Sequence, residues 1–236
     1  MRDLLYLSET KMRALAPQLP QRIRQRLGLE AGLNLGMVSI RTTLPAESAG
    51  SSLVLLDAVV AMIEQEQGSR WRTDEVRAGD WIQFEEDFHY GSGWPGRAGV
   101  DVDVMAGLVY FAASAPPPLV LCGSAAHVVD RRQPGDPPSR QVGVFYMDAV
   151  RAYAREVAGL PDEGAAGTLP SPAESRSRSL AYALSWLCRV DAQGDPGWTG
   201  PVRLAGHARV LAVPDNPSGE QMVLATPLYV QYALDP

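Results

Sequence analysis

Residues 81–90 alternate between apolar and polar side chains, and this alternation predicts a half-buried β-strand. Ile82, Phe84 and Phe88 lie on one side of the predicted strand, and Glu85 and Asp87 lie on the other. Further strands are predicted where short apolar or alternating runs are bounded by turn residues. These runs are residues 4–7, 37–42, 100–104, 108–113, 119–122, 202–213 and 221–225.

Residues 53–67 predict a helix that is apolar on nearly every side for three turns, which indicates a buried helix. Pro17 stops a shorter predicted helix, and Pro20 is placed to start the next one. Because the strands form hairpins beside helices, we expect an α+β fold with an antiparallel or mixed sheet and flanking helices. The shorter helices are predicted at residues 9–16, 21–27, 144–157 and 174–190.

The chain of 236 residues is expected to form one compact unit, residues 1–236. Residues 107–129 and 206–230 share an order: a strand, a Pro-containing turn, a strand ending in Val-Leu, and a Ser or Thr that starts a helix. This internal repeat predicts two related halves, 1–130 and 141–236, joined by a Pro- and Gly-rich linker at 131–140. Two unrelated hairpin–helix units are the alternative.

Three segments lead from an apolar strand into a Ser or Thr, and these residues are Ser8, Ser124 and Thr226. Ser and Thr are preferred helix N-caps because their side-chain oxygen accepts a hydrogen bond from a free backbone N–H. Pro227 stands where proline is best tolerated in a helix. We therefore expect a helix to begin at each of the three residues. Helix starts also bind anions, so all three are candidate ligand-binding residues, with capping alone as the alternative.

Lys11 strengthens the anion interpretation. It is the only lysine among 21 basic residues. A cation in the first turn of a helix is disfavoured by the helix dipole by about 0.3–1 kcal/mol, so a lysine there makes sense where it helps to hold an anion. Ser8, Thr10 and Lys11 would then bind a phosphate or carboxylate; a solvated lysine is the alternative. The chain has no Walker A sequence.

Glu86 interrupts the apolar side of its predicted strand. A buried carboxylate has a raised pKa and can act as a general acid or base, and His89 would add a second titratable group. Glu86 and His89 are therefore candidate catalytic residues. The alternative is a solvated Glu86 on a strand at the edge of the sheet.

Cys122 and Cys188 lie in apolar stretches and are expected to be buried free thiols. A catalytic pair of Cys122 with His127 is not favoured, because a nucleophilic thiol needs an electropositive and accessible setting. Three scattered histidines and two distant cysteines have no zinc spacing, so neither a metal nor a cofactor is predicted.

The net charge of −6 argues against nucleic acid and against an anionic membrane surface as partners. The longest apolar run is too short to span a bilayer, and no signal peptide is evident. A cytoplasmic protein is therefore expected. The sequence leaves the oligomeric state open.

Three blocks of the sequence, at residues 6–11, 121–128 and 225–230, resemble a family of uncharacterised bacterial proteins. Members of that family begin with Tyr-Leu/Ile-Ser-x-x-Lys and end near Gly-Ser/Thr-Pro-Leu-Tyr-Val. Ala225 stands where the family has Gly. The resemblance implies no established activity, but it directs attention to the same three segments.

Three functions are open at this point. The leading one is a ligand-binding or sensor-like accessory protein that holds a small anionic metabolite or nucleotide at Ser8 and Lys11. The second is a hydrolase or transferase that uses Glu86 or His89 in acid–base catalysis. The third is a scaffold that binds protein partners through the loop around Trp94 or the linker at 131–140.

Overall fold

The computed structural model describes residues 2–28, 47–92, 108–129, 180–181, 184–185, 187–188, 198–214, 219 and 221–233. The helical elements are α1 (Glu9–Leu15), η1 (Ala16–Gln18), α2 (Gln21–Arg26), α3 (Glu47–Met62), the π-helical turn η3 (Ile63–Gln67) and η4 (Ala125–His127). The strands are β1 (Leu4–Leu7), β2 (Arg70–Trp71), β3 (Trp81–Ser92), β4 (Leu108–Ala113), β5 (Leu119–Ser124), β6 (Trp198–Ala212) and β7 (Val223–Tyr232).

Five strands close into a barrel in the order β3-β4-β5-β7-β6, because β6 pairs with both β3 and β7. The β5–β7 pair is parallel, and the other four pairs of the barrel are antiparallel. Two short strands extend it: β1 lies antiparallel to β7, and β2 lies parallel to β3. The predicted α+β fold with a mixed sheet is confirmed, and the sheet is closed.

Apolar side chains from all five strands fill the barrel, among them Phe84, Phe88 and Phe111. Gly206 makes room for this packing, because a Cβ there would lie 2.8 Å from the ring of Phe84 and would also meet the backbone of β7. The alternation in residues 81–90 therefore has the expected cause: the even-numbered apolar residues face the interior.

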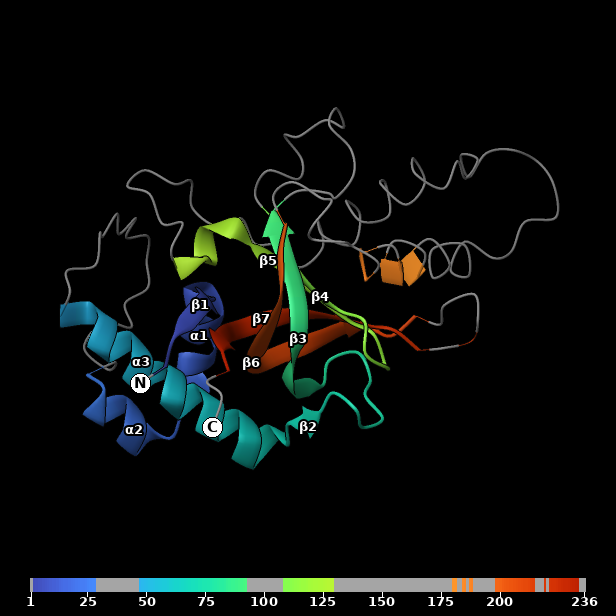
Figure 1. The fold of residues 1–236 in the computed structure, drawn as a ribbon. Coiled ribbons are helices and arrows are strands. Elements are labelled where there is room, and N and C mark those ends of the chain that lie inside the picture. The colour runs from blue at the N-terminus through green and yellow to red at the C-terminus, as the bar shows by residue number, and fades with distance from the viewer. Residues whose placement is uncertain are drawn as a thin grey trace, which may run out of the picture.

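Two further apolar clusters cover the outside of the barrel. The first joins β1, α1 and α3 to the outer side of β7 through residues such as Met12, Leu56 and Leu228. The second packs Leu180, Leu184 and Leu187 against β4, β5 and β7. Figure 1 shows these layers, with α1, α2 and α3 on one side of the barrel and the helical residues of 180–188 on the other.

The predicted helix start at Thr226 is wrong. Residues 223–232 form one strand, which pairs with β6 over most of its length. The prediction failed because Thr226-Pro227 fits a helix start locally, whereas pairing with a strand earlier in the chain decides the conformation. After Ser124 only the single turn of η4 follows, so α1 is the only helix of more than one turn at the three predicted starts.

The two segments proposed as an internal repeat both form antiparallel hairpins, β4–β5 and β6–β7. Their second strands lie parallel to each other. The helix expected at the end of the second segment is missing, so the duplication stays a prediction. The predicted strands at 37–42 and 100–104, the helix at 144–157, the loop around Trp94 and the linker at 131–140 lie outside the described residues. Within the described ranges, no helix combines the length and apolar character needed to cross a membrane.

Candidate functional site

The carboxyl ends of β1 and β5 meet beside the middle of β7. On one edge of β7, β5 pairs with residues 223–225 and β1 pairs with residues 229–231, while β6 occupies the other edge. The backbone N–H of Ser8 continues the β1 ladder by donating to the carbonyl of Leu228. Pro227 lies between the residues of β7 that pair with β5 and those that pair with β1. Because proline has no backbone N–H, no hydrogen-bond donor is left unpaired at this position.

Lys11 extends from α1 into this junction. Its Nζ donates hydrogen bonds to Oγ1 of Thr226 and to the carbonyl of Pro227, each 2.6 Å long. Both acceptors are neutral, and no carboxylate among the described residues forms an ion pair with Lys11. The junction therefore holds an amine whose described partners carry no compensating charge.

Burial lowers the pKa of Lys11 from 10.5 to about 7, and the nearby Cys122 thiol opposes this shift. Burial raises the pKa of Cys122 itself, and hydrogen bonding to Tyr110 and the charge of Lys11 oppose that rise. At neutral pH the thiol is therefore protonated, and Lys11 is divided between its charged and neutral forms. Cys122 is buried and free, as expected, whereas the free Cys188 is only partly buried.

Hydroxyl groups surround the same junction. Tyr6 is buried, and its pKa is raised by burial and by Cys122, while hydrogen bonds to the Ser124 backbone and to the Ser8 side chain oppose the rise. Ser8 is 2% exposed and Ser124 is 7% exposed. Gly123 is required here, because a Cβ would lie 2.6 Å from the hydroxyl oxygen of Tyr6. We call Tyr6, Ser8, Lys11, Cys122, Ser124 and Thr226 the junction cluster.

The structure brings together one candidate residue from each of the three predicted segments, but not as helix caps. The side chains of Ser8 and Ser124 make no capping hydrogen bond, and Thr226 lies within a strand. Ser8 is instead hydrogen-bonded to Tyr6, and Thr226 to Lys11. Thr10, the remaining ligand-binding candidate, lies on the exposed side of α1.

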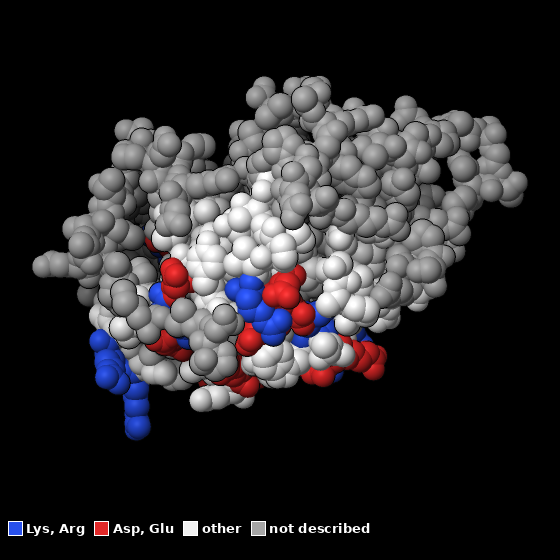
Figure 2. All heavy atoms as spheres, in the orientation of Figure 1, with Lys and Arg blue, Asp and Glu red and all other residues white. Residues whose placement is uncertain are grey.

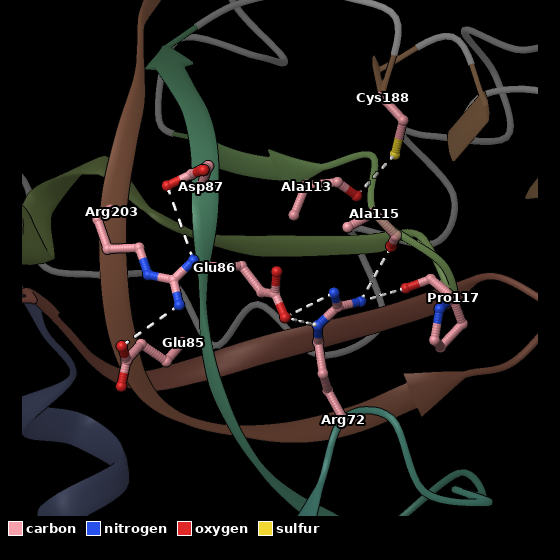
Figure 3. Close-up of polar contacts among 9 residues, drawn as sticks. All are labelled: Arg72, Glu85, Glu86, Asp87, Ala113, Ala115, Pro117, Cys188 and Arg203. Atoms are coloured by element: carbon pink, nitrogen blue, oxygen red, sulfur yellow. Dashed lines mark hydrogen bonds and ion pairs between the residues drawn. The ribbon is translucent and has the colours of Figure 1, made fainter.

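Glu86 is bound by Arg72. The Nε and Nη2 atoms of Arg72 lie 2.8 and 2.7 Å from Oε1 of Glu86, and Nη1 donates to the carbonyls of Ala115 and Pro117 in the β4–β5 turn. Figure 3 shows this arrangement. At Glu86, β3 pairs with β6, whereas β2 and β4 pair with β3 only at residues 82–83 and 89–92. Glu86 therefore has a paired strand on one side only, but Arg72 binds its carboxylate and only 22% of its side chain is exposed.

His89, the other catalytic candidate, follows on β3 and lies against β6. Its Nδ1 is buried without a hydrogen bond, and a Cβ on Gly200 would lie 3.0 Å from it. The β3–β6 pairing is irregular between Phe88 and Tyr90, at the position of His89. His89 therefore occupies a bulge, and its described surroundings contain no partner that would make it an acid–base group.

On the outer side of β3, charges of both signs lie close together. Arg203 of β6 lies 3.4 Å from Glu85 and 3.9 Å from Asp87 (Figure 3). Figure 2 shows acidic and basic side chains side by side on this face. The side chains of these residues are about half exposed or more. Exposed ion pairs contribute only about 0–1 kcal/mol to the free energy of unfolding. We therefore assign these pairs no functional role.

A second polar cluster was not predicted from the sequence. His207 of β6 lies 3.2 Å from the hydroxyl of Tyr229 through Nδ1 and 3.3 Å from Glu64 of η3 through Nε2. Arg2 covers the ring of Tyr229 at 5.0 Å and pairs with Asp57 of α3 at 2.8 Å. Burial, together with the charge of Arg2, lowers the pKa of His207 from 6.5 to about 4, so the ring is neutral at pH 7.

The cluster around His207 joins α3 and η3 to the barrel. In the sequence, His207 stands alone within the predicted strand at 202–213 and Glu64 lies near the end of the predicted helix at 53–67, and neither position indicates the other. The described residues contain no group of three or more His, Cys, Asp or Glu that is arranged to hold a metal ion.

A comparison with protein-family models shows what the chain is related to. Residues 2–233 match the model of a family of unknown function, DUF7019. The chain belongs to DUF7019. Because the match covers nearly the whole chain, the barrel and the junction cluster both lie within the DUF7019 region. No curated protein and no solved structure matches the chain.

Proposed function

We propose that this DUF7019 protein binds a small anionic ligand, such as a phosphorylated or carboxylated metabolite, at the junction cluster. The observation that carries the proposal is the position of Lys11: its Nζ is desolvated, and its described partners are two neutral oxygens. A buried cation is costly unless it is paired with an opposite charge. An anion that reaches Lys11 would supply that charge.

The hydroxyl groups of the cluster support the same assignment. Thr226 and Ser8 can each donate a hydrogen bond to an anion, and a charge-assisted hydrogen bond is roughly twice as strong as a neutral one. The sequence predicted that the free N–H groups of a helix start would bind the anion. This cannot apply at Thr226, because Thr226 lies in β7. The ligand would instead be held by side chains from α1, β5 and β7.

The two alternatives have less support. The enzyme hypothesis needs Glu86 as an acid or base, but Arg72 already binds its carboxylate. The scaffold hypothesis depends on the loop around Trp94 and the linker at 131–140, and both lie outside the described residues. A sensor-like role, in which ligand binding is passed to another protein, is compatible with the anion site and needs its own test.

The test is a thermal-shift titration with inorganic phosphate, pyrophosphate, sulfate and AMP. An anion present at 100 times its Kd stabilises the folded state by about 2.7 kcal/mol, which raises the Tm of a protein of this size by roughly 5–10 °C. Lys11→Met should abolish the shift, and Lys11→Arg, which stays charged, should retain part of it. A shift of equal size in Lys11→Met would overturn the assignment.

The pH dependence provides an independent check. Sulfate keeps its charge throughout the neutral range, so a change in its affinity reports on the protein. If only protonated Lys11 binds, affinity for sulfate should fall by about tenfold for each pH unit above 7. In Lys11→Arg the affinity should not change over that range, because an arginine does not titrate there.

A further inference from the structure

The chain uses lysine at one position only. Its 21 basic residues comprise Lys11 and 20 arginines. The buried Arg72 is paired with Glu86, whereas the described partners of Lys11 are neutral. An arginine is always charged, but an amine can lose its proton and become a nucleophile. The single lysine therefore stands where an amine offers chemistry that a guanidinium cannot.

We propose that Lys11 captures its ligand covalently, by forming an imine with the carbonyl group of an anionic aldehyde or a 2-oxo acid. This inference rests on the proposed function, because it names the ligand class for the same site. It stands on the geometry of the junction cluster, in which Lys11 is a residue of intermediate exposure and its Nζ lies 2.6 Å from the hydroxyl oxygen of Thr226.

The chemistry needs no group beyond those present. The lone pair of the neutral Nζ attacks the carbonyl carbon, a C–N bond forms, and the carbonyl oxygen takes up a proton to give a carbinolamine. Loss of that hydroxyl group with one further proton releases water and leaves a C=N bond. The hydroxyl of Thr226 is close enough to Nζ to pass protons between nitrogen and oxygen.

The product also preserves the charge pairing of the proposed function. A protonated imine is a cation, and in a 2-oxo acid it lies next to the carboxylate. Imine formation thus leaves a positive charge facing the ligand's negative charge, with the Pro227 carbonyl and Thr226 hydroxyl still beside the nitrogen. Burial lowers the pKa of Lys11 to about 7, so that about half of the molecules hold the nucleophilic form at neutral pH, against about one in a thousand or fewer for an ordinary lysine.

The experiment traps the imine in the full chain. The protein is incubated at neutral pH with pyridoxal 5′-phosphate or glyoxylate, reduced with sodium borohydride, and mapped by mass spectrometry. Since Lys11 is the only lysine, the α-amino group is the one other primary amine that can react, and it serves as an internal reference. We expect one adduct on Lys11. The labelling rate of Lys11, divided by that of the α-amino group, should be higher in the native protein than in urea.

Matched variants separate the two proposals. Thr226→Val should slow the labelling of Lys11 by pyridoxal 5′-phosphate by roughly tenfold or more, whereas Thr226→Ser should not. Native protein that is labelled on the α-amino group but not on Lys11 would overturn covalent capture, and the thermal shift with sulfate would still decide anion binding. Labelling of Lys11 without any thermal shift from sulfate, phosphate, pyrophosphate or AMP would support the reactive amine and overturn the anion site.

Discussion

Lys11 Nζ and Thr226 Oγ1 lie 2.6 Å apart, although the two residues are separated by 215 positions in the sequence. The contact links α1, near the N-terminus, to the last strand of the barrel. It is possible because β1 and β7 pair and the backbone N–H of Ser8 bonds to Leu228, which places the first turn of α1 beside Thr226. The barrel therefore brings a titratable amine and a hydroxyl group together.

Replacing Lys11 with Met should change how the stability of the protein depends on pH. The pKa of Lys11 is about 7 in the folded state and about 10.4 in the unfolded state, so between these values the unfolded state binds more protons. The free energy of unfolding should therefore rise with pH, by about 1.4 kcal/mol per unit. Lys11→Met should remove this rise.

The measurement is made between pH 7 and about 8.5, and the titration of unfolded cysteines, with an ordinary pKa of about 8.5, cancels between the native protein and Lys11→Met because both contain the same cysteines. Urea unfolding at several pH values in this window gives the slope, and Lys11→Arg serves as the control that keeps a charge in place. Equal slopes in the native protein and in Lys11→Met would show that Lys11 has an ordinary pKa in the folded state.

Thr226→Val should lower the pKa of Lys11 further. The Thr226 hydroxyl accepts a hydrogen bond from the ammonium form, and a hydrogen bond to a charged group favours that form. Its loss should lower the pKa by about one to two units, since such a bond contributes about 1.5–3 kcal/mol. In protein labelled with ¹⁵N-lysine a single side-chain signal reports the titration, and Thr226→Ser should leave it unchanged. A pKa that does not move in Thr226→Val would contradict the contact.

Local patterns predicted most of the described strands and helices. β3, β4 and β5 were predicted because their alternation or apolar runs are set by the strand's own neighbours, and α1 and α2 because prolines bound them. Thr226 was assigned wrongly for the same reason: a Pro227 that fits a helix start is indistinguishable, over a few residues, from one at a junction between strands. The pairing of β7 with β6 decides between them, and it is not a local property.

The candidate site shows the same division. The sequence singled out Ser8, Ser124 and Thr226 because each follows an apolar strand at a predicted helix start, and Lys11 because it is the only lysine. It did not show that Lys11 contacts Thr226, which depends on the closure of the barrel. It also missed Arg72, although a glutamate on the apolar side of a strand is itself a signal, since a buried charge needs a partner.

Arg72→Met should destabilise the protein by about 3 kcal/mol or more, because it leaves the carboxylate of Glu86 partly buried and unpaired. Glu86→Gln should cost less, since a glutamine oxygen still accepts a hydrogen bond from Arg72. The double variant Arg72→Met/Glu86→Leu should recover part of the loss, which chemical denaturation measures. Additive effects of the two positions would show that the pair is not coupled.

His207→Gln should make the protein less sensitive to acid. Burial and Arg2 hold the pKa of His207 at about 4 despite the carboxylate of Glu64 nearby, and the unfolded value is 6.5. Between these values the unfolded state binds more protons, so the free energy of unfolding falls by up to about 1.4 kcal/mol for each unit of acidification. Glutamine cannot titrate but can still accept a hydrogen bond from the Tyr229 hydroxyl, so the slope between pH 6.5 and 4 should become smaller. Urea unfolding over that range measures it, with His89→Gln as the matched replacement, and an unchanged slope in His207→Gln would mean that the pKa of His207 is the same in the folded and unfolded states.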